Sequence, residues 1–561
     1  MIYDSKPWLR FYDQGVNPEV DIPKVTVKDW AEQVVRDFPD RPAFHFLGVT
    51  WTYRKLIENA DRFAQALSEH GIGKGDVLAI NLFNCPQYLI AIIGAIKAGV
   101  IFSGLSPLFT ADETGHQLSD LDAKAMITSD NLLEEKLVGI TDKVPNLKLV
   151  LVTKLLDFVE ESKPVSTPKK LPGKEVRWLK EFLSHKSGRP PEIRMTPEDI
   201  CCIQYTGGTT GVPKGAVVTH RNIVANVSQY GEWLKTERGR ELLICGFPMF
   251  HVAGLFHVMQ SLAFAFTQVL IPNPRDTKHI IHEMARYRPT FMAAVPTLYL
   301  LLLQEPEFHR LDFSSLKTCM CGAAPFPVEK IKDLEEVVGP DKLIEVFGMT
   351  ETGPLLAANP KKGLKKTGSI GFPLPSTRLK LVDTDTGQKE VPQGEEGEII
   401  ARGPQVMKGY FNKPQETATT LREHNGELWM YTGDVARMDE DGYFYIVDRV
   451  KDMINVGGYK VFSNEVEQKF SENPAIEICA LVGVPNPERP GSELVKLVVQ
   501  KSQSYRDQPD DLVKEQLQIF VRERLAPYKV PKIIEFVESM PLTSVGKIDK
   551  KALRIQASKK S

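Results

Sequence analysis

A glycine- and threonine-rich stretch lies between two apolar runs in the first half of the chain. It contains Thr206, Gly207, Gly208, Thr209, Thr210 and Gly211, and ends in Lys214 and Gly215. Glycines let a backbone turn its N–H groups toward an anion, threonine hydroxyls add donors, and lysine adds a mobile positive charge. The flanking runs, 200–204 and 216–218, are short and rich in Ile and Val, which predicts strands. We interpret the stretch as a polyphosphate-binding loop; the alternative is a flexible surface hairpin.

The spacing around the lysine separates this loop from the common P-loop. A P-loop requires glycine directly before the lysine and serine or threonine directly after it. Here Pro213 precedes Lys214 and Gly215 follows it. The spacing therefore disfavours a kinase or a P-loop NTPase.

Several downstream residues could complete a nucleotide site. The adjacent Thr350 and Glu351 combine a hydroxyl that can contact phosphate with a carboxylate that can hold Mg²⁺, although a capped helix start would look similar. Asp434 follows a predicted strand and suits ribose hydroxyls, although turn aspartates are common. His251 lies in an apolar stretch, where a lone histidine is usually a core residue, and Lys547 alone would be a solvated charge.

Length and composition narrow the classes of protein. A chain of 561 residues predicts two to four domains, and a net charge of -2 gives no argument for nucleic acid or an acidic membrane surface. The seven cysteines lack CxxC spacing, which disfavours metal and disulfide sites. The amino terminus lacks a signal peptide, and polar residues interrupt the apolar runs 88–105 and 253–271, which indicates buried helices. We expect a cytoplasmic protein.

Alternating helix and strand patterns predict an α/β fold. Residues 26–155 include a helix capped by Thr52 and ending near Gly71, followed by a strand at 77–80. Repeated units of this kind predict doubly wound, mostly parallel sheets. The Lys-, Pro-, Ser- and Glu-rich stretch 160–197 predicts a surface excursion with no assigned role.

The second half of the chain predicts two further parts. Short strands with glycine turns indicate a β-rich subdomain at about 368–445, within a large N-terminal domain at 1–450. Residues 451–561 predict a small α+β domain.

Five motifs, in order, resemble those of the acyl-adenylate-forming superfamily of acyl-CoA synthetases, peptide-synthetase adenylation domains and beetle luciferases. They lie at 205–215, 245–256, 345–352, 429–449 and 541–549, so the resemblance covers nearly the whole chain. It is greatest to prokaryotic medium- to long-chain fatty acyl-CoA ligases.

The resemblance implies roles for individual residues. Lys547, Thr350, Glu351 and His251 would form the catalytic set, with Thr350 on the α-phosphate, His251 lining the acyl pocket, and Glu351 and Thr206 holding the metal. ATP and CoA would contact Thr206, Gly207, Gly208, Thr209, Thr210, Gly211, Lys214, Gly322, Ala323, Ala324, Pro325, Glu345, Phe347, Gly348, Asp434, Arg449, Lys451, Gly457 and Gly458. The family usually has tyrosine at the position of Phe347, so the ring near the adenine is kept and the hydroxyl contact is lost.

The implied reaction is AMP-forming ligation of a carboxylic acid to CoA, using ATP and Mg²⁺. Adenylation would come first; the C-terminal domain would then swing about Lys451, withdraw Lys547 and bring Gly457 and Gly458 beside a pantetheine tunnel. The apolar residues near His251 favour medium- to long-chain fatty acids. The expected partners are a carboxylic acid, ATP and CoA, with no nucleic acid.

Other interpretations stay open. An aryl-acid CoA ligase of the benzoate or cinnamate type is the first alternative. An acyl-AMP ligase without CoA activity, a luciferase-like oxygenase and a non-catalytic nucleotide- or lipid-binding protein are the others. A peptide-synthetase module is disfavoured because no carrier domain follows the Lys547 motif. Chain length of the acid, peripheral membrane contact and a homodimer are not decided by the sequence.

Overall fold

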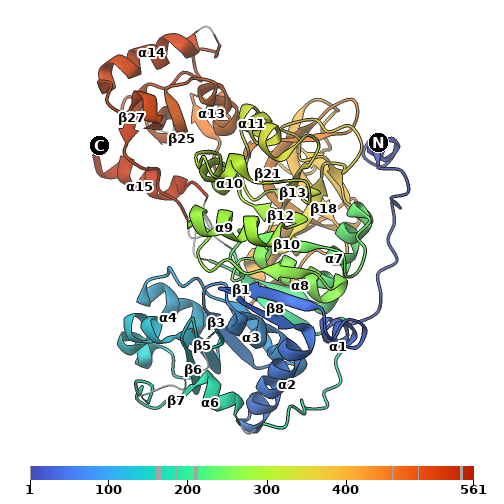
Figure 1. Ribbon diagram of the computed structural model, residues 1–561. Coiled ribbons are helices and arrows are strands. Elements are labelled where there is room, and N and C mark those ends of the chain that lie inside the picture. Colours follow the sequence, from blue (N-terminus) through green and yellow to red (C-terminus); the bar gives the residue numbers. More distant parts are fainter. Residues whose placement is uncertain are drawn as a thin grey trace.

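The structure is a computed structural model that describes residues 2–159, 167–184, 186–206, 213–457, 459–489, 492–522, 524–543 and 547–560, without the side chains of 557–560. Two large sheets form its body, and an antiparallel sheet and a small C-terminal part pack beside them (Figure 1). In Figure 1 the C-terminal elements lie above α9 (Thr277–Tyr287) and next to α10 (Pro296–Leu303).

The first large sheet carries the glycine-rich loop. Its eight described strands run in the order β19 (Gly409–Tyr410), β9 (Gly215–Thr219), β8 (Ile200–Tyr205), β4 (Ile101–Gly104), β3 (Val77–Asn81), β5 (Ala125–Ser129), β6 (Leu149–Thr153) and β7 (Glu175–Trp178). Strands β8 to β7 are parallel, whereas β8, β9 and β19 pair antiparallel. The helices α2 (Tyr53–Glu69), capped by Thr52, and α3 (Pro86–Lys97) confirm the predicted helices.

The second large sheet carries the later motifs. Within the described chain its nine strands run in the order β16 (Phe372–Pro373), β15 (Leu355–Ala358), β14 (Leu343–Gly348), β13 (Thr318–Cys321), β12 (Phe291–Ala294), β10 (Leu242–Cys245), β11 (Thr267–Val269), β1 (Pro42–Phe46) and β2 (Val49–Thr52). The central strands are parallel, as the α/β pattern predicts. Loops at the carboxyl ends of such strands are where ligands bind in open α/β sheets.

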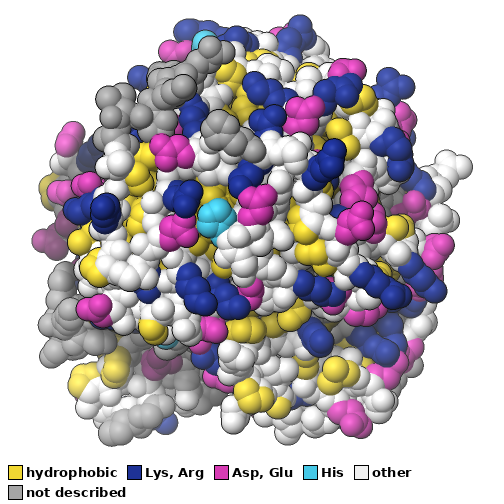
Figure 2. All heavy atoms as spheres, turned by 90° about the horizontal axis from the view of Figure 1, so that it is seen from below, with side chains coloured by type: hydrophobic (Ala, Val, Ile, Leu, Met, Phe, Trp, Pro, Cys, Tyr) yellow, Lys and Arg dark blue, Asp and Glu magenta, His cyan; other side chains and the backbone are white. Residues whose placement is uncertain are grey.

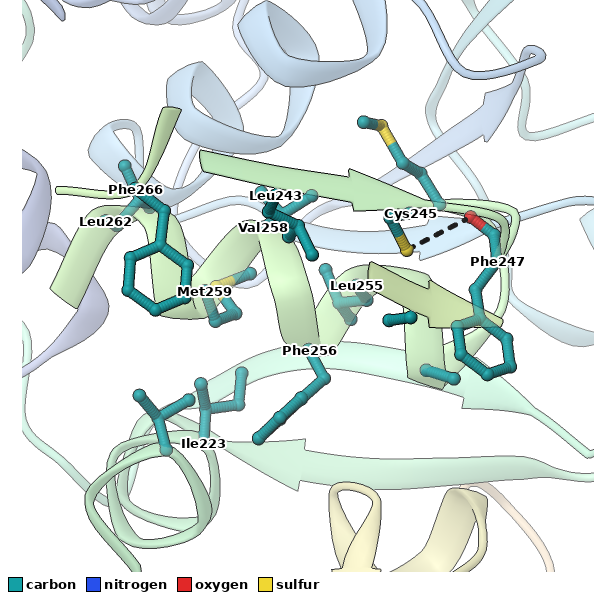
Figure 3. Close-up of a cluster of buried hydrophobic side chains, with 14 of the residues drawn as sticks. Ile223, Leu243, Cys245, Phe247, Leu255, Phe256, Val258, Met259, Leu262 and Phe266 are labelled. Carbon is teal, nitrogen blue, oxygen red and sulfur yellow. Dashed lines mark hydrogen bonds between the residues drawn. The ribbon is translucent and has the colours of Figure 1, made fainter. Parts of the chain in front are cut away.

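The helix α8 (Val252–Phe264) is buried, as its apolar composition predicts. One of its faces packs on β10 through Val258, beside Leu243, while Phe256 points the other way, toward Ile223 of α7 (His220–Leu234) (Figure 3). A helix buried on both faces needs an apolar surface all round, which explains its lack of charged residues.

The antiparallel sheet expected after residue 368 is present. It consists, in the part that the structure describes, of β17 (Arg378–Val382), β18 (Glu396–Arg402), β20 (Leu421–His424), β21 (Glu427–Met438) and β22 (Phe444–Arg449).

The C-terminal part is α+β, as predicted. Its strands are β23 (Ile454–Val456), β24 (Tyr459–Val461), β25 (Ile476–Pro485), β26 (Glu493–Lys501) and β27 (Ile533–Val537), and its helices are α13 (Ser463–Ser471), α14 (Asp510–Arg522) and α15 (Lys550–Lys560). Residues of α13 and α14, such as Phe470 and Leu517, join Leu481 and Leu497 in a separate core.

The prediction of a plain surface excursion at 160–197 is wrong for residues 175–183. Strand β7 extends the first sheet parallel to β6, and α6 (Leu179–Leu183) follows it with Leu179 and Phe182 buried. The charged composition hides this element because β7 is an edge strand in which Trp178 is the one buried residue.

None of the described helices is both long enough and apolar enough to cross a membrane. Figure 2 shows a face on which lysine and arginine side chains alternate with aspartate and glutamate. On this face no single sign of charge dominates, in agreement with the near-zero net charge.

Candidate active site

The glycine-rich loop joins β8 to β9, as predicted. The backbone N–H of Thr206 donates to the carbonyl of Lys214 at 2.9 Å, and the Thr206 hydroxyl accepts from the Lys214 N–H at 3.4 Å. The Lys214 ammonium lies 5.0 Å from the centre of the Tyr410 ring. The tip of the loop, with Gly207, Gly208, Thr209, Thr210 and Gly211, lies outside the described residues.

Thr350 and Glu351 follow β14 in a short 3-10 turn. Both are only 8% exposed. The turn begins at Gly348, where any side chain would collide with the Pro354 carbonyl, so the chain can approach itself closely only with glycine. The structure thus places the hydroxyl and carboxylate together at the carboxyl end of a central strand.

The surroundings of Glu351 fit a bound Mg²⁺. Its Oε1 accepts a hydrogen bond of 2.6 Å from Tyr410, and among the described residues no cationic side chain forms an ion pair with it. A buried carboxylate that forms no ion pair is suited to an oxygen-preferring cation shared with phosphates.

Asp434 and Arg449 face each other across the β21–β22 pair. The Arg449 Nε lies 3.0 Å from Asp434 Oδ1, the carboxylate is buried, and the guanidinium is 44% exposed. The sequence predicts Asp434 after a strand, but it lies inside β21. Gly433, at φ 73°, adopts a left-handed conformation that lets β21 continue past an irregular step in its pairing with β18.

Lys547, from the C-terminal part, lies among these charged groups. Burial lowers its pKa to about 8, the nearby Arg449 acts in the same direction, and Asp434 and Glu351 oppose the shift. Residues predicted at positions as far apart in the chain as Glu351 and Lys547 thus share one electrostatic environment.

The pKa of Lys547 leads to a prediction for ATP use. Only the charged ammonium attracts phosphate, so kcat/KM for ATP in the pyrophosphate-releasing step should fall about tenfold per pH unit above about pH 8. The arginine of Lys547→Arg stays charged above pH 8, so this variant should not show the alkaline decrease in kcat/KM, even if its rate is lower at every pH. Pyrophosphate release measured from pH 6.5 to 9.5 checks this, and an identical decrease in Lys547→Arg would contradict it.

His251 lies at the N-terminus of α8. Its Nδ1 accepts from the Ala253 N–H at 3.3 Å, and burial, with Lys547 nearby, lowers its pKa to about 3. A neutral imidazole of such low basicity is a poor general acid or base. This geometry favours a lining and capping role over the predicted catalytic one.

Other residues predicted to contact ATP or CoA lie directly after β13 or on β14. Gly322, Ala323, Ala324 and Pro325 directly follow β13, and Ala323 has a φ of 71°. Glu345 and Phe347 lie two residues apart on β14, so their side chains point to the same face of the strand. Burial raises the pKa of Glu345 to about 8, against a hydrogen bond from the Gly368 N–H at 3.1 Å, so this carboxyl is mainly protonated at neutral pH.

Lys451 and Gly457, predicted as the hinge and a CoA contact, follow β22 in the chain. Lys451 is exposed in the turn after β22, and the Gly457 N–H donates to Ser492 at 2.9 Å, within the C-terminal part. Gly458 lies outside the described residues. The structure therefore brings Lys547, rather than Gly457, to the charged cluster.

A small apolar cavity adjoins the cluster. It is lined by Cys202, Gln204, Val218, Ile223, Val252, Leu255, Phe256, Met259 and Gly353. Four of these residues share one face of α8 (part of which is seen in Figure 3), with the spacing of a helix side, and Val252 directly follows His251. The cavity thus lies beside α8, next to the N-terminal end of this helix.

Sequence reasoning missed two residues at this site, Tyr410 and Asp120. Tyr410 contacts both Glu351 and Lys214. Asp120 accepts from the Tyr205 hydroxyl at 2.6 Å and from Lys413 at 2.9 Å. Their only signal in the sequence is a tyrosine and an aspartate in polar segments, and nothing there pairs them with the loop.

Two large sheets, a hairpin loop, a buried threonine–glutamate pair and a C-terminal lysine that reaches them define the class of adenylate-forming enzymes. Residues 31–411 match the AMP-binding enzyme family, and residues 465–547 match the AMP-binding enzyme C-terminal domain. The chain belongs to the AMP-binding enzyme family and, within it, to the acyl-CoA ligases.

Individual relatives agree with this assignment. A long-chain-fatty-acid–CoA ligase of Bacillus subtilis (strain 168) is 38% identical, over 98% of both chains. A feruloyl-CoA synthase of an Amycolatopsis species is 32% identical, over 94% of this chain and 98% of its own. An anthranilate CoA ligase, solved with anthranoyl-AMP, has the same fold, with a TM-score of 0.85 at 24% identity over 96% of this chain and 98% of its own.

Proposed function

We propose that the protein joins medium- to long-chain fatty acids to CoA, in an AMP-forming reaction that proceeds through an acyl adenylate. The observation that carries the proposal is the position of Lys547. It lies among Glu351, Asp434 and Arg449, beside a cavity whose lining is apolar apart from Gln204. An acid whose carboxylate reached this cluster would leave its tail along α8.

In the first half-reaction, a carboxylate oxygen attacks the α-phosphorus of ATP, a P–O bond forms, and pyrophosphate leaves with the electron pair of the broken P–O bond. Attack of one anion on another is slow unless positive charge lies between them. Lys547 would supply that charge, Lys214 would hold the outer phosphates, and Asp434 would accept from the ribose hydroxyls. Bound Mg²⁺, held by Glu351, would neutralise phosphate charge.

In the second half-reaction, the CoA thiol attacks the acyl carbon and AMP leaves. The C-terminal part must then present a different face. Two of its polar contacts with the body are exposed, whereas Ser463 also donates to the buried Asp448 carboxylate. Gln304 of α10 donates to Glu477 at 2.9 Å, and Lys460 pairs with Asp385 at 3.0 Å. Exposed pairs of this kind contribute about 0–1 kcal/mol each, so these two contacts would oppose a rotation about the turn at Lys451 only weakly.

The cavity leads to a prediction for acid length. Val252 and Met259 lie seven residues apart on one face of α8, about 10 Å along its axis. Met259→Trp should lower kcat/KM at least about tenfold for long acids and spare shorter ones, whereas Val252→Trp should impair both. Met259→Leu, which nearly conserves volume, serves as the control. Equal losses for all lengths in Met259→Trp would place the tail elsewhere.

An aryl acid is the second candidate, and one observation favours it. The Oε1 atom of Gln204, in the cavity wall, is buried and has no hydrogen-bond partner among the described residues. A buried acceptor without a donor is costly, and a phenolic hydroxyl or an aryl amine would satisfy it.

An acid panel tests the function. Pyrophosphate release and thioester formation would be measured with acids from acetate to palmitate and with benzoate, cinnamate and their hydroxylated forms, each with and without CoA. Thioester formation that peaks at a medium or long aliphatic acid supports the proposal, and a peak at an aryl acid selects the alternative. Adenylate without thioester for every acid would overturn the assignment of CoA as acceptor.

A further inference from the structure

Tyr410 contacts the proposed metal ligand and the loop lysine with a single side chain. It lies on the two-residue strand β19, which pairs antiparallel with β9 through Ala216. This pairing places Tyr410 next to the strand that leaves the glycine-rich loop. The two ends of its side chain then meet two different parts of the site.

The hydroxyl of Tyr410 contacts Glu351. It donates to Glu351 Oε1 at 2.6 Å, and the carboxylate is 8% exposed. A tyrosine hydroxyl is protonated at neutral pH and can donate only one hydrogen, so one carboxylate oxygen is held and the other remains available. The bond therefore fixes the rotation of the carboxylate.

The ring of Tyr410 contacts Lys214. The ammonium lies 5.0 Å from the ring centre, within the range of a cation–π interaction. Such a contact limits the positions of a long, flexible side chain without neutralising its charge. Lys214 therefore keeps its full charge for a phosphate.

The backbone of Tyr410 is anchored on both sides of the loop. Its N–H donates to the Thr417 hydroxyl at 2.9 Å, and the next residue, Phe411, donates to the Gly215 carbonyl at 2.7 Å. Farther along, Lys413 pairs with Asp120 at 2.9 Å, and Asp120 also accepts from Tyr205, on the opposite stem of the loop.

We propose that Tyr410 is a positioning residue that sets the Glu351 carboxylate and the Lys214 ammonium at a fixed separation for Mg·ATP. This inference rests on the proposed function, because it assigns Mg²⁺ to Glu351 and phosphate to Lys214. The residue touches neither reacting atom, and acts through the two groups that it holds.

The test compares Mg·ATP binding in wild-type protein and in Tyr410→Phe. The variant keeps the ring and loses the hydroxyl bond to a charged group, so calorimetric titration of the full chain, without acid or CoA, should show about tenfold weaker binding at limiting Mg²⁺. High Mg²⁺ should restore most of the loss. The Mg²⁺ concentration for half-maximal pyrophosphate release should rise by a similar factor, with thioester formation from supplied acyl-AMP unchanged.

Two further variants isolate the Tyr410–Glu351 contact. Tyr431→Phe is a matched control, because its hydroxyl also donates at 2.6 Å, to the Gly387 carbonyl, and its ring also lies under a cation, Arg422. It should leave the Mg²⁺ dependence unchanged. In a Glu351→Ala background, Tyr410→Phe should have no further effect, since the interacting pair is already broken.

The outcomes separate this inference from the proposed function. A Tyr410→Phe titration that superimposes on the wild-type titration at every Mg²⁺ concentration overturns the inference. The inference is also overturned if Tyr431→Phe shifts the Mg²⁺ dependence as much as Tyr410→Phe does. If wild-type protein releases no pyrophosphate with any acid, the proposed function fails, while the binding titration still decides the role of Tyr410.

Discussion

Lys547→Ala is expected to lower the rate of pyrophosphate release by about a hundredfold or more. The same variant should convert supplied acyl-AMP and CoA to thioester at close to the wild-type rate. The reason is positional: Lys547 lies with Glu351 and Asp434 in the conformation described here, where the phosphate chemistry would occur. Removing one preorganised positive group at a developing charge typically costs two to three orders of magnitude.

The experiment measures the two half-reactions separately, by pyrophosphate release without CoA and by thioester formation from synthetic acyl-AMP. Lys551→Ala is the matched control, because it removes an equal charge from an exposed side chain in the same segment. It should leave both rates unchanged. An equal loss of both half-reactions in Lys547→Ala would show that this lysine has no specific role in adenylation.

The elements around the site were predictable where local pattern and burial agree. The runs at 200–204 and 216–218 are strands because their apolar residues lie in a buried sheet, and the polar residues between them can only be a loop. Likewise α8 was predictable as a buried helix, because a charge-free run of its length has no other stable environment. These conclusions need no knowledge of distant contacts.

The contacts between motifs were not predictable from local pattern. Nothing in the residues around Lys547 indicates that it lies near Asp434; only the family resemblance suggested it. Asp434 itself was expected directly after a strand, whereas it lies inside β21, where Gly433 accommodates an irregularity. Tyr410 was overlooked because a two-residue strand has no periodicity, and its partners are set by strand pairing.

The groups of the site differ in how firmly the fold holds them. Asp434 and the stems of the loop lie on paired strands, and Glu351 lies in the turn between the paired strands β14 and β15. Lys547 directly precedes Ile548, which bridges to Leu542, and belongs to a part with its own core. The proposed withdrawal of Lys547 would therefore leave the other charged groups in place.

Asp434→Asn is expected to change both the affinity for ATP and the pH dependence of adenylation. Loss of a carboxylate that accepts from ribose hydroxyls should weaken ATP binding about a hundredfold. The Asp434 charge also favours the charged form of Lys547, whose pKa is about 8, so its removal should lower that pKa further. The alkaline limb of kcat/KM should therefore begin below pH 8, and less of the enzyme should be active at pH 7.5.

Thermal unfolding distinguishes this effect from general damage. Burial raises the pKa of Asp434, so its ionised form is less favourable in the folded protein than in the unfolded chain. A neutral asparagine should then leave the melting temperature at neutral pH unchanged or slightly higher. Asp439→Asn is the converse control, because Asp439 pairs with Lys366 at 2.6 Å away from the site. Asp439→Asn should have a lower melting temperature and the wild-type alkaline decrease of kcat/KM. A wild-type alkaline decrease in Asp434→Asn would show that Asp434 and Lys547 are not coupled.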